Sequence, residues 1–445
     1  MYQSLALSLV TTIGLTLSGF SFAQTKPAEV PAAITSDTSN ATLSNDIPLK
    51  ELRLFTRIFD HIRRAYVEPI SDQELLENAI KGMLGEMDPH SAYLDASSFE
   101  QLQESTKGEF TGIGIEMGSE DGFIKVIAPI DGTPAARAGL QAGDIIVKVD
   151  QESVQGLSVS EAAKRIRGPI GSPVEFTIIR AGIEKPLNIT IVRDTIKSLS
   201  IRQRVIDEHI AYIRIAQFQS ATGTDFIAAL QKLRNDTPEL NGLIIDLRNN
   251  PGGILQSSVQ VVDALINEGT IVYTQGRLES SNISYSATSG DNSGDLPVVV
   301  LINGGSASAS EIVAGALQDH RRAVIMGTRS FGKGSVQTIL PVGDKKGIKL
   351  TTARYFTPKG RSIQAQGIEP DIIVEPATIT AIKTGDRVTE ASLGGHLKNT
   401  EKNDKGDKNK EPSNNKDEAL TQDNQLFEAI NLLKGLAILT PRNDT

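Results

Sequence analysis

The sequence contains no cysteine, no tryptophan and only five histidines among its 445 residues. The missing thiols exclude a cysteine nucleophile, a disulfide framework and any zinc or iron–sulfur site built on cysteine. The histidines form no HExxH pattern or other paired-ligand spacing, and they stand at His61, His90, His209, His320 and His396. The sequence therefore predicts a protein without a metal or other cofactor, stabilised by packing alone.

An excess of positive charge is also missing, because 45 Lys and Arg face 54 Asp and Glu and leave a formal net charge of -9. Proteins that bind nucleic acids usually carry a basic face. We therefore expect no nucleic-acid partner. The length allows two or three domains at roughly 100 to 200 residues each.

Residues 1–23 resemble an export signal. Residues 5–23 are apolar or small, and Ser21 and Ala23 provide the small side chains that precede a signal-peptidase site. The stretch departs from a signal in one respect, since no Lys or Arg precedes it to form the positive n-region. An uncleaved membrane anchor is the alternative, because about 19 such residues nearly span a bilayer. The next residues, 24–47, are rich in Pro, Ala, Ser and Thr and are typical of a flexible linker.

A second low-complexity run, residues 386–424, is dominated toward its end by Lys, Asn, Asp and Glu, which predicts a disordered linker. Residues 425–445 follow it and contain a short amphipathic helix, since Leu426, Ala429 and Leu433 recur at helical spacing. Such a helix needs an apolar surface to cover, either on the same chain or on a second copy.

Residues 48–105 predict a small helical region. Apolar residues recur at spacings of three and four from Leu49 to Ile62 and again from Leu75 to Met83, with Ser71 and Asp72 as the cap between them.

Residues 106–195 predict a β-rich module that resembles a PDZ domain, which binds protein C-termini by adding the peptide as an extra strand. A short helix and turn at 134–146 precede a second helix at 160–166, beside which the strand 174–179 can pair. A glycine-containing loop enters the first strand and exposes backbone N–H groups that could hold a terminal carboxylate. Its residues are Gly112, Ile113, Gly114 and Ile115. An ordinary hairpin or bulge is the alternative for the two glycines.

From residue 196 to 385 strands and helices alternate, which predicts an α/β layered core. The strands at 242–247 and 298–302 are continuously apolar, as expected for strands buried on both faces. The other predicted elements are strands at 211–215 and 323–326 and helices at 222–233, 257–266 and 309–318.

A run of small residues leaves the strand 298–302 and enters a helix through Ser306, Ser308 and Ser310. Small side chains let a substrate backbone approach, and the start of a helix offers unpaired N–H groups and a positive dipole end, both suited to an oxyanion. Taken alone, the pattern favours a plain helix cap completed by Glu311.

Lys333 lies between two glycines after the strand 323–326. To act as a general base it must be neutral, so its ordinary pKa of about 10.4 must fall through desolvation. A phosphate-binding loop fits poorly, because Gly334 stands where Ser or Thr is required and 336–340 alternates like a strand. A surface turn with a solvated lysine is the other alternative.

Residues 246–253 follow the apolar strand 242–247, and their paired glycines could aim a backbone N–H at a reacting carbonyl group. The alternative is an ordinary strand-to-helix turn.

Together these stretches resemble the carboxy-terminal processing peptidases, the S41 family of Ser-Lys serine proteases that carry a PDZ domain. The resemblance covers residues 50 to 375 in order: MDPHSAYL at 87–94, the PDZ module, DLRNNPGG at 246–253, SASASE at 306–311, and FGKG at 331–334 followed by Gln337. It implies an α+β or α/β multidomain fold, with a helical N-terminal region, a PDZ domain inserted before a ClpP/crotonase-like α/β protease core, and a C-terminal helix.

The resemblance also implies roles for single residues. Ser308 is the nucleophile, Lys333 is the general base, and Gln337 orients the lysine. The backbone N–H groups of Ala309 and Gly253 form the oxyanion hole. Arg167, rather than the nearby Arg165, couples binding of a C-terminus to activation. The matching stretches 351–358 and 367–371 are interpreted as sheet edge and peptide groove, and His320, the one rival base, as a polar residue at a helix end.

We therefore expect an exported serine endopeptidase that recognises apolar protein C-termini through its PDZ domain and cleaves or degrades the protein with a Ser-Lys dyad. The alternative is a PDZ-type scaffold or chaperone whose protease core is inactive or depends on an adaptor. A crotonase-like acyl-CoA enzyme has a related core but explains neither the PDZ module nor the signal. The resemblance also implies a periplasmic location and a lipoprotein adaptor, while the helical region at the start and the helix at 425–439 predict a homo-oligomer.

Overall fold

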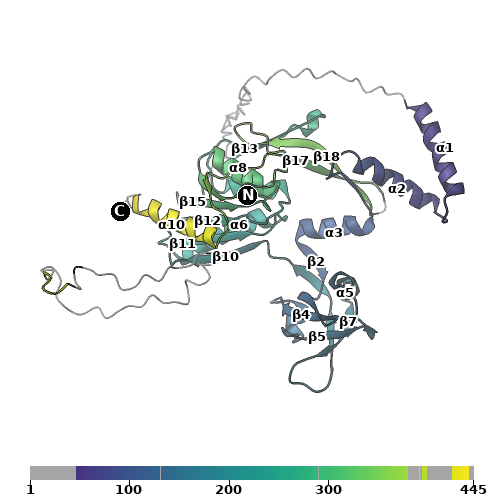
Figure 1. Ribbon diagram of the computed structural model, residues 1–445, viewed down its shortest axis with the longest axis horizontal. Helices are drawn as coiled ribbons and strands as arrows, with labels where there is room; N and C mark the ends of the chain where they lie inside the picture. Colours follow the sequence, from purple (N-terminus) through teal and green to yellow (C-terminus); the bar gives the residue numbers. More distant parts are fainter. Residues whose placement is uncertain are drawn as a thin grey trace, which may run out of the picture. The chain divides into compact units, whose positions relative to one another are not determined.

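The computed structural model describes residues 47–378 except 131, 289 and 344, together with 390, 393–397 and 423–439 (Figure 1). The predicted signal lies outside the described residues, as do nearly all of the linker 24–47 and most of the run 386–424. The chain divides into one unit that ends at Asp72 and a second that begins at Gln73. None of the described helices has both the length and the apolar character needed to cross a bilayer.

The main element of the first unit is helix α1 (Leu49–Ala65), whose apolar residues recur at helical spacing. None of its residues is buried, and Leu52 and Phe55 are among its exposed apolar side chains. Asp60 accepts a hydrogen bond from Arg63 on the next turn. The predicted amphipathic helix is confirmed, and its apolar stripe is exposed.

Helix α2 (Asp72–Gly85) leads into the second unit and is followed by β1 (Ala92–Leu94) and α3 (Ala96–Lys107). Asp95 caps α3 by accepting a backbone hydrogen bond, and Gly108, with a φ of 73°, ends it. The helical region predicted for 48–105 is therefore confirmed except at residues 92–94, which pair antiparallel with strand β18.

The chain enters and leaves the β-rich module through β2 (Glu109–Gly112) and β9 (Asp194–Lys197), which pair with each other. The sheet of the module has the order β3-β4-β5-β7-β8, with β6 paired to β5. Its strands are β3 (Ile115–Glu120), β4 (Phe123–Pro129), β5 (Ile145–Val149), β6 (Glu152–Ser153), β7 (Pro173–Ile179) and β8 (Leu187–Val192). Strand β3 lies at the edge of this sheet, where a further strand can be added.

Two helices, α4 (Pro134–Arg137) and α5 (Val159–Ile166), complete the module. Its separate hydrophobic core includes the fully buried side chains of Val126, Ile146 and Phe176. The predicted PDZ-like order of strands and helices is confirmed.

A six-stranded sheet of order β10-β11-β12-β15-β16-β19 forms the centre of the rest of the chain. Strand β10 runs antiparallel to β11, and the other neighbours are parallel. The strands are β10 (Ile201–Ile206), β11 (Ile210–Ile215), β12 (Gly242–Asp246), β15 (Val298–Ile302), β16 (Ala323–Gly327) and β19 (Ile372–Ile373). The predicted strands of the α/β core are confirmed, with small shifts at some ends.

Helices cover both faces of this sheet (Figure 1). Helices α6 (Thr222–Asp236), α7 (Leu255–Asp263) and α8 (Ala309–Asp319) pack on one face, and α10 (Asn424–Leu439) packs on the other. Along β12, Leu243 and Ile245 belong to the first core while Ile244 belongs to the second. Burial on both faces explains the continuously apolar strands. The predicted C-terminal helix therefore docks on its own chain.

A second sheet has the order β1-β18-β13-β14, with β17 also paired to β18, and it joins β1 from before the PDZ-like module to strands that follow it. Its other strands are β13 (Thr270–Gly276), β14 (Ser284–Ser286), β17 (Ser335–Pro341) and β18 (Gly347–Phe356), and the turn η1 (Glu279–Ser281) joins β13 to β14. Residues 351–356 were interpreted from sequence as a sheet edge, which is wrong. They lie in β18, which has partners on both sides.

Candidate active site

Three turns meet at the edge of the central sheet where its parallel strands end, the usual place for ligand sites in such sheets. Residues 247–253 follow β12, residues 303–308 follow β15, and residues 328–334 follow β16. The Ala307 N–H donates to the Asn250 carbonyl (3.0 Å), and the Phe331 N–H donates to the Ser306 carbonyl (3.0 Å). The fold therefore brings together the three motifs singled out in the sequence.

The three serines of the middle turn have different environments. Ser306 and Ser310 are fully buried, and their hydroxyls donate to the carbonyls of Leu247 (2.8 Å) and Asn250 (3.0 Å). Ser308 is partly exposed and is the N-cap residue of α8, with a φ of 58° and a ψ of -115°. A non-glycine residue in this region of backbone space is strained, and such strain is common at functional sites.

The carboxylate of Glu311 joins the serine turn to the lysine turn. Its Oε2 accepts hydrogen bonds from the backbone N–H groups of Ser308 (2.8 Å) and Lys333 (2.9 Å). Its Oε1 accepts from the Gly332 N–H (2.7 Å) and the Ser330 hydroxyl (2.6 Å). Burial raises the pKa of this carboxyl group, and the four hydrogen bonds oppose that shift. The capping arrangement expected for Glu311 is present, and the same group reaches the second turn.

Lys333 is the partly buried cation of this site. Burial lowers the pKa of its ammonium group, and the positive charge of Lys349 lowers it further. Asp88 and Glu311 oppose this shift with their negative charges. A lowered lysine pKa increases the fraction of neutral amine near neutral pH, as a general base requires.

Gln337 lies four residues further along, in β17. Its side-chain Nε2 donates to the hydroxyls of Ser335 (2.9 Å) and Thr351 (3.3 Å). Among the hydrogen bonds of the described residues, none joins the Lys333 ammonium to Gln337 or to Ser308. The structure brings the three side chains to adjacent turns and strands without a direct bond to the lysine.

Gly252 and Gly253 approach the chain too closely for any other residue. A Cβ atom on Gly252 would lie 2.7 Å from the Ser308 Cβ and 2.9 Å from the Ala309 nitrogen, and one on Gly253 would lie 2.1 Å from the Phe218 carbonyl oxygen. Both glycines also have positive φ values, of 98° and 140°. Within the described part of the chain, neither the Ala309 nor the Gly253 N–H donates to a protein acceptor. Both are therefore available to a substrate oxygen.

A buried ion pair stands beside this glycine turn, and sequence reasoning gave it no role. Asp246 is fully buried at the end of β12 and accepts hydrogen bonds from the Tyr212 hydroxyl (2.8 Å) and from Arg248 Nη2 (2.7 Å). Arg248 also donates to Asp423 at the start of α10 (2.7 Å). The sequence signal for this ion pair was the presence of opposite charges, Asp246 and Arg248, at the end of a buried apolar strand, since buried charges are usually paired.

Tyr355 of β18 is buried directly under the site. Its hydroxyl donates to the Lys333 carbonyl and lies within hydrogen-bonding reach of the Ser308 side chain. Burial raises the pKa of this phenol well above its ordinary value, with the charge of Glu311 acting in the same direction. The phenol is therefore protonated, and residues 351–356 support the site from within the sheet.

The candidate peptide-binding residues lie at the start of the PDZ-like sheet. Gly112 ends β2, Ile113 is buried in the core, and Ile115 begins edge strand β3. Gly114 has a φ of 79°, and a Cβ atom there would lie 2.4 Å from the Cβ of Thr133. The glycine is therefore required by local packing. Gly112, Ile113 and Gly114 are buried, and Ile115 is partly exposed.

Arg167 connects the PDZ-like module to helix α3. It pairs with Glu104 at 3.0 Å, and its guanidinium carbon lies 5.9 Å from the centre of the Phe110 ring. Arg165 instead pairs with Glu152 at 3.1 Å. The predicted role of Arg167 in coupling stays a prediction.

His320 is the C-cap residue of α8, and its Nε2 lies 2.7 Å from the Thr270 carbonyl oxygen. Ser308 stands at the other end of this helix, about 18 Å away at the rise of an α-helix. The interpretation of His320 as a polar residue at a helix end is confirmed.

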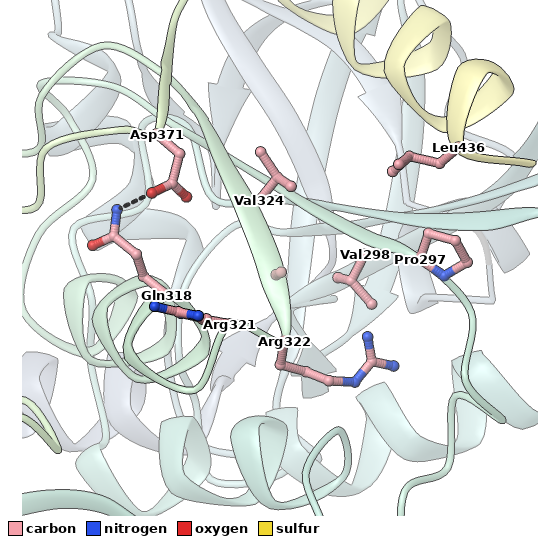
Figure 2. Close-up of a pocket in the computed structure, with 9 residues that line it drawn as sticks. Pro297, Val298, Gln318, Arg321, Arg322, Val324, Asp371 and Leu436 are labelled. Atoms are coloured by element: carbon pink, nitrogen blue, oxygen red, sulfur yellow. Dashed lines mark hydrogen bonds between the residues drawn. The ribbon is translucent and has the colours of Figure 1, made fainter. Parts of the chain in front are cut away.

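A cavity of about 330 Å³ lies at the opposite edge of the central sheet (Figure 2). It is lined by Pro297 and Val298 at the start of β15, by Arg322 and Val324 around the start of β16, and by Leu436 of α10. The cavity lies at the start of β15 and β16, whereas two of the three turns lie at their ends, so it is not part of the candidate site.

Three family models match the chain. The model of peptidase family S41 covers residues 209–374, the PDZ domain model covers 125–180, and the model of the activating protease CtpB N-terminal domain covers 9–98.

Curated proteins similar to the chain carry related names. A carboxy-terminal-processing protease of Bartonella bacilliformis is 49% identical over 391 residues, which are 87% of this chain and 89% of the relative. The carboxy-terminal processing protease CtpB of Bacillus subtilis is 37% identical over 330 residues, 73% of this chain and 68% of the relative. The structure of a photosystem II D1 C-terminal processing protease is 30% identical, covering 74% of this chain and 94% of its own, with a TM-score of 0.44.

Proposed function

The chain belongs to peptidase family S41, the carboxy-terminal processing proteases with a PDZ domain, and we propose that it is a serine endopeptidase with Ser308 as nucleophile and Lys333 as general base. The observation that carries the proposal is the Glu311 carboxylate, which accepts hydrogen bonds from the backbone N–H groups of both residues. The lowered pKa of the partly buried Lys333 supports its role as a base.

The reaction follows from these positions. Neutral Lys333 takes the proton of the Ser308 hydroxyl as Oγ attacks the peptide carbonyl carbon, and the N–H groups of Ala309 and Gly253 hold the oxyanion that forms. The Lys333 ammonium then gives its proton to the leaving amine. Water hydrolyses the acyl-enzyme with Lys333 again as base, and Gln337 orients the lysine throughout.

We propose that the PDZ domain selects substrates by their apolar C-termini. Edge strand β3 can pair with an extended peptide, and the backbone of residues 112–115 lies where its terminal carboxylate would bind. The side chains of the peptide would then lie against α5, which packs beside β3.

One observation favours a protease that rests in an inactive state. Gln337 donates to Ser335 and Thr351, and no hydrogen bond among the described residues holds the Lys333 ammonium. We infer that a bound C-terminus or an adaptor brings Lys333 to Ser308 and Gln337. A permanently inactive scaffold is the competing function.

We further propose that residues 1–23 direct export to the periplasm, that a lipoprotein serves as adaptor, and that the protein works as a homo-oligomer. The exposed apolar stripe of α1 supports self-association. Export is tested by cell fractionation of the tagged chain, and the adaptor by capture of partners on a Ser308→Ala variant. Self-association is tested by the solution mass with and without residues 47–66.

The decisive test is proteolysis of an unfolded reporter with an apolar C-terminal tail. We expect Ser308→Ala and Lys333→Ala each to lower kcat by at least about 1000-fold, because each removes a group that reacts in the rate-limiting chemistry. His320→Gln should cut at the parental rate. Parental cleavage by Ser308→Ala, with thermal unfolding unchanged, would overturn the mechanism.

The dependence on the tail separates a gated protease from a scaffold. We expect free apolar tail peptides to accelerate cleavage of a second, tail-less reporter by the parent protein. A rate that stays constant with every tail would reject gating by the PDZ domain. Peptide binding without any cleavage, in the presence of candidate adaptors as well, would favour the scaffold.

A further inference from the structure

Residues 86–91 have no role in the proposed function, yet they contact the sheet that carries Gln337. Asp88 accepts hydrogen bonds from the N–H groups of His90 (2.8 Å) and Ser91 (2.9 Å) and from the Ser91 hydroxyl (2.6 Å). These bonds form a tight turn before β1. The Oδ1 of Asp88 also accepts a hydrogen bond from the Thr351 hydroxyl of β18 (3.1 Å), which attaches the turn to the second sheet.

The same Thr351 hydroxyl contacts Gln337. Strands β17 and β18 are antiparallel, and their register shifts between Val336 and Gln337, so that Gln337 lies opposite Thr351 and Thr352 is passed over. The shift places the Gln337 amide 3.3 Å from the Thr351 oxygen. A continuous chain of hydrogen bonds therefore runs from Gln337 through Thr351 to Asp88.

The direction of this chain is fixed by its far end. The Oδ1 of Asp88 can only accept, and it already accepts two backbone N–H groups, so the single proton of the Thr351 hydroxyl must point toward it. That hydroxyl then offers Gln337 only a lone pair, which binds the Nε2 side of the amide. The second Nε2 proton is used by Ser335 (2.9 Å). The amide oxygen of Gln337 is left as the group that can accept a hydrogen bond from an ammonium.

We propose that Asp88 is a positioning residue that acts through the Thr351 hydroxyl to hold the Gln337 amide with its oxygen available to Lys333. A glutamine turned the other way would present an NH2 group to the ammonium, and two donors cannot bind each other. The inference rests on the proposed function, because it requires Lys333 to be the base that Gln337 orients.

The charges around the site are consistent with this role. Burial opposes ionisation of Asp88, but the hydrogen bonds from Ser91, His90 and Thr351 outweigh it and lower the pKa of the carboxyl group. Asp88 is therefore an acceptor at neutral pH. The charges that act on Lys333 are those of Lys349, Asp88 and Glu311. The charge of Lys333 itself contributes, after burial, to lowering the pKa of His90.

The test uses the Thr351→Val variant, which replaces the hydroxyl with a methyl group of the same size and keeps the backbone bond from the Thr351 nitrogen to Ser91 (3.1 Å). We expect kcat on the tailed reporter to fall roughly tenfold or more, with little change in KM, because one hydrogen bond that orients the base is lost. Thr351→Ser restores the hydroxyl and should recover most of the parental kcat.

A double-mutant cycle tests whether Asp88 acts through Thr351. Asp88→Ala should lower kcat by about as much as Thr351→Val, and the double variant should lose little more than either single variant. Asp88→Asn keeps the acceptor oxygen and should retain more activity than Asp88→Ala. The matched control is Asp95→Ala. Asp95 caps the start of α3, shortly after Asp88 in the sequence, and its loss should leave kcat unchanged.

The outcomes separate this inference from the proposed function. Parental kcat in Thr351→Val, or fully additive losses in the double variant, would overturn the positioning role of Asp88. The Ser-Lys mechanism would still hold in that case if Ser308→Ala and Lys333→Ala are inactive. An active Lys333→Ala would overturn both. Thermal unfolding of every variant identifies losses of activity that come from misfolding. Where a variant is partly unfolded, its kcat is calculated per folded molecule before the Thr351→Ser recovery and the double-mutant cycle are evaluated.

Discussion

The serine turn and the lysine turn differ in how the fold holds them. The serine turn leaves the fully buried strand β15 and enters α8, and both flanking serines are bonded to the turn after β12. The lysine turn leaves β16 but continues into β17 of the second sheet, where Lys333 is only partly buried. The proposed nucleophile thus stands on the rigid core, while the proposed base stands where two sheets join.

This difference indicates which half of the site can be regulated. The side chains around Ser308 are packed on all sides, so any displacement there disturbs the central core. The Lys333 backbone is bonded to the Glu311 carboxylate and to the Tyr355 hydroxyl of β18, and β18 is in turn bonded to Asp88 in the turn before β1. We therefore expect regulation to act on the position of the lysine, with the serine held ready.

The largest effect should come from uncoupling the two turns with Glu311→Gln. Whichever way the new amide lies, its NH2 group faces a backbone N–H that can only donate, at Gly332 or at both Ser308 and Lys333. We expect the free energy of unfolding to fall by about 2 to 4 kcal/mol and kcat to fall at least 100-fold. Chemical denaturation and the reporter assay measure both.

The control is Asp319→Asn, which changes a buried carboxylate at the far end of the same helix, paired with Arg361 at 2.6 Å. It should lower stability yet keep the activity per folded molecule. Equal losses of activity in the two variants would mean that Glu311 stabilises α8 without joining the two turns.

A smaller effect is expected when the serine turn alone is displaced, by Gly252→Ala. The added methyl group would lie 2.6 Å from the Ala307 carbonyl oxygen and 2.7 Å from the Ser308 Cβ, at a φ of 98° that alanine rarely adopts. We expect a loss of kcat of roughly 10- to 100-fold through displaced oxyanion donors. Gly304→Ala, whose Cβ would meet nothing within 4 Å, is the matched control. A parental rate in Gly252→Ala would contradict the rigidity of this turn.

The sequence was sufficient to predict strands β11, β12, β15 and β16 of the central sheet and the turns after the last three, because buried parallel strands are continuously apolar and small residues mark their ends. It did not predict the edge strands β10 and β19. It was insufficient for the second sheet. Residues 92–94 pair with β18 from more than 250 positions away, and no local periodicity reports such a partner. The interpretation of 351–356 as a sheet edge failed for the same reason.

The contacts within the site were predictable only where one motif held both partners. Ser308 and Glu311 lie three positions apart on one helix, so their capping bond followed from spacing. The hydrogen bonds between Glu311 and Lys333 and between Asp88 and Thr351 join residues that are distant in the sequence and meet only in the folded chain. The opposite charges of Asp246 and Arg248 were visible in the sequence. The second partner of Arg248, Asp423, was not predictable, because it lies at the end of the low-complexity run 386–424.

The smallest and most specific effect concerns the charge on the lysine side. Lys349 lowers the pKa of Lys333, after burial, by placing a second positive charge nearby. In Lys349→Gln the pKa of Lys333 should rise, less of the amine is neutral at a given pH, and the acid limb of kcat/KM should move to higher pH. Asp88→Asn removes a negative charge and should move the limb to lower pH. Lys359→Gln, an exposed lysine that is not among the charges acting on Lys333, should leave the limb in place. If Lys349→Gln and Asp88→Asn moved the limb in the same direction, the group that titrates in the assay would not be Lys333.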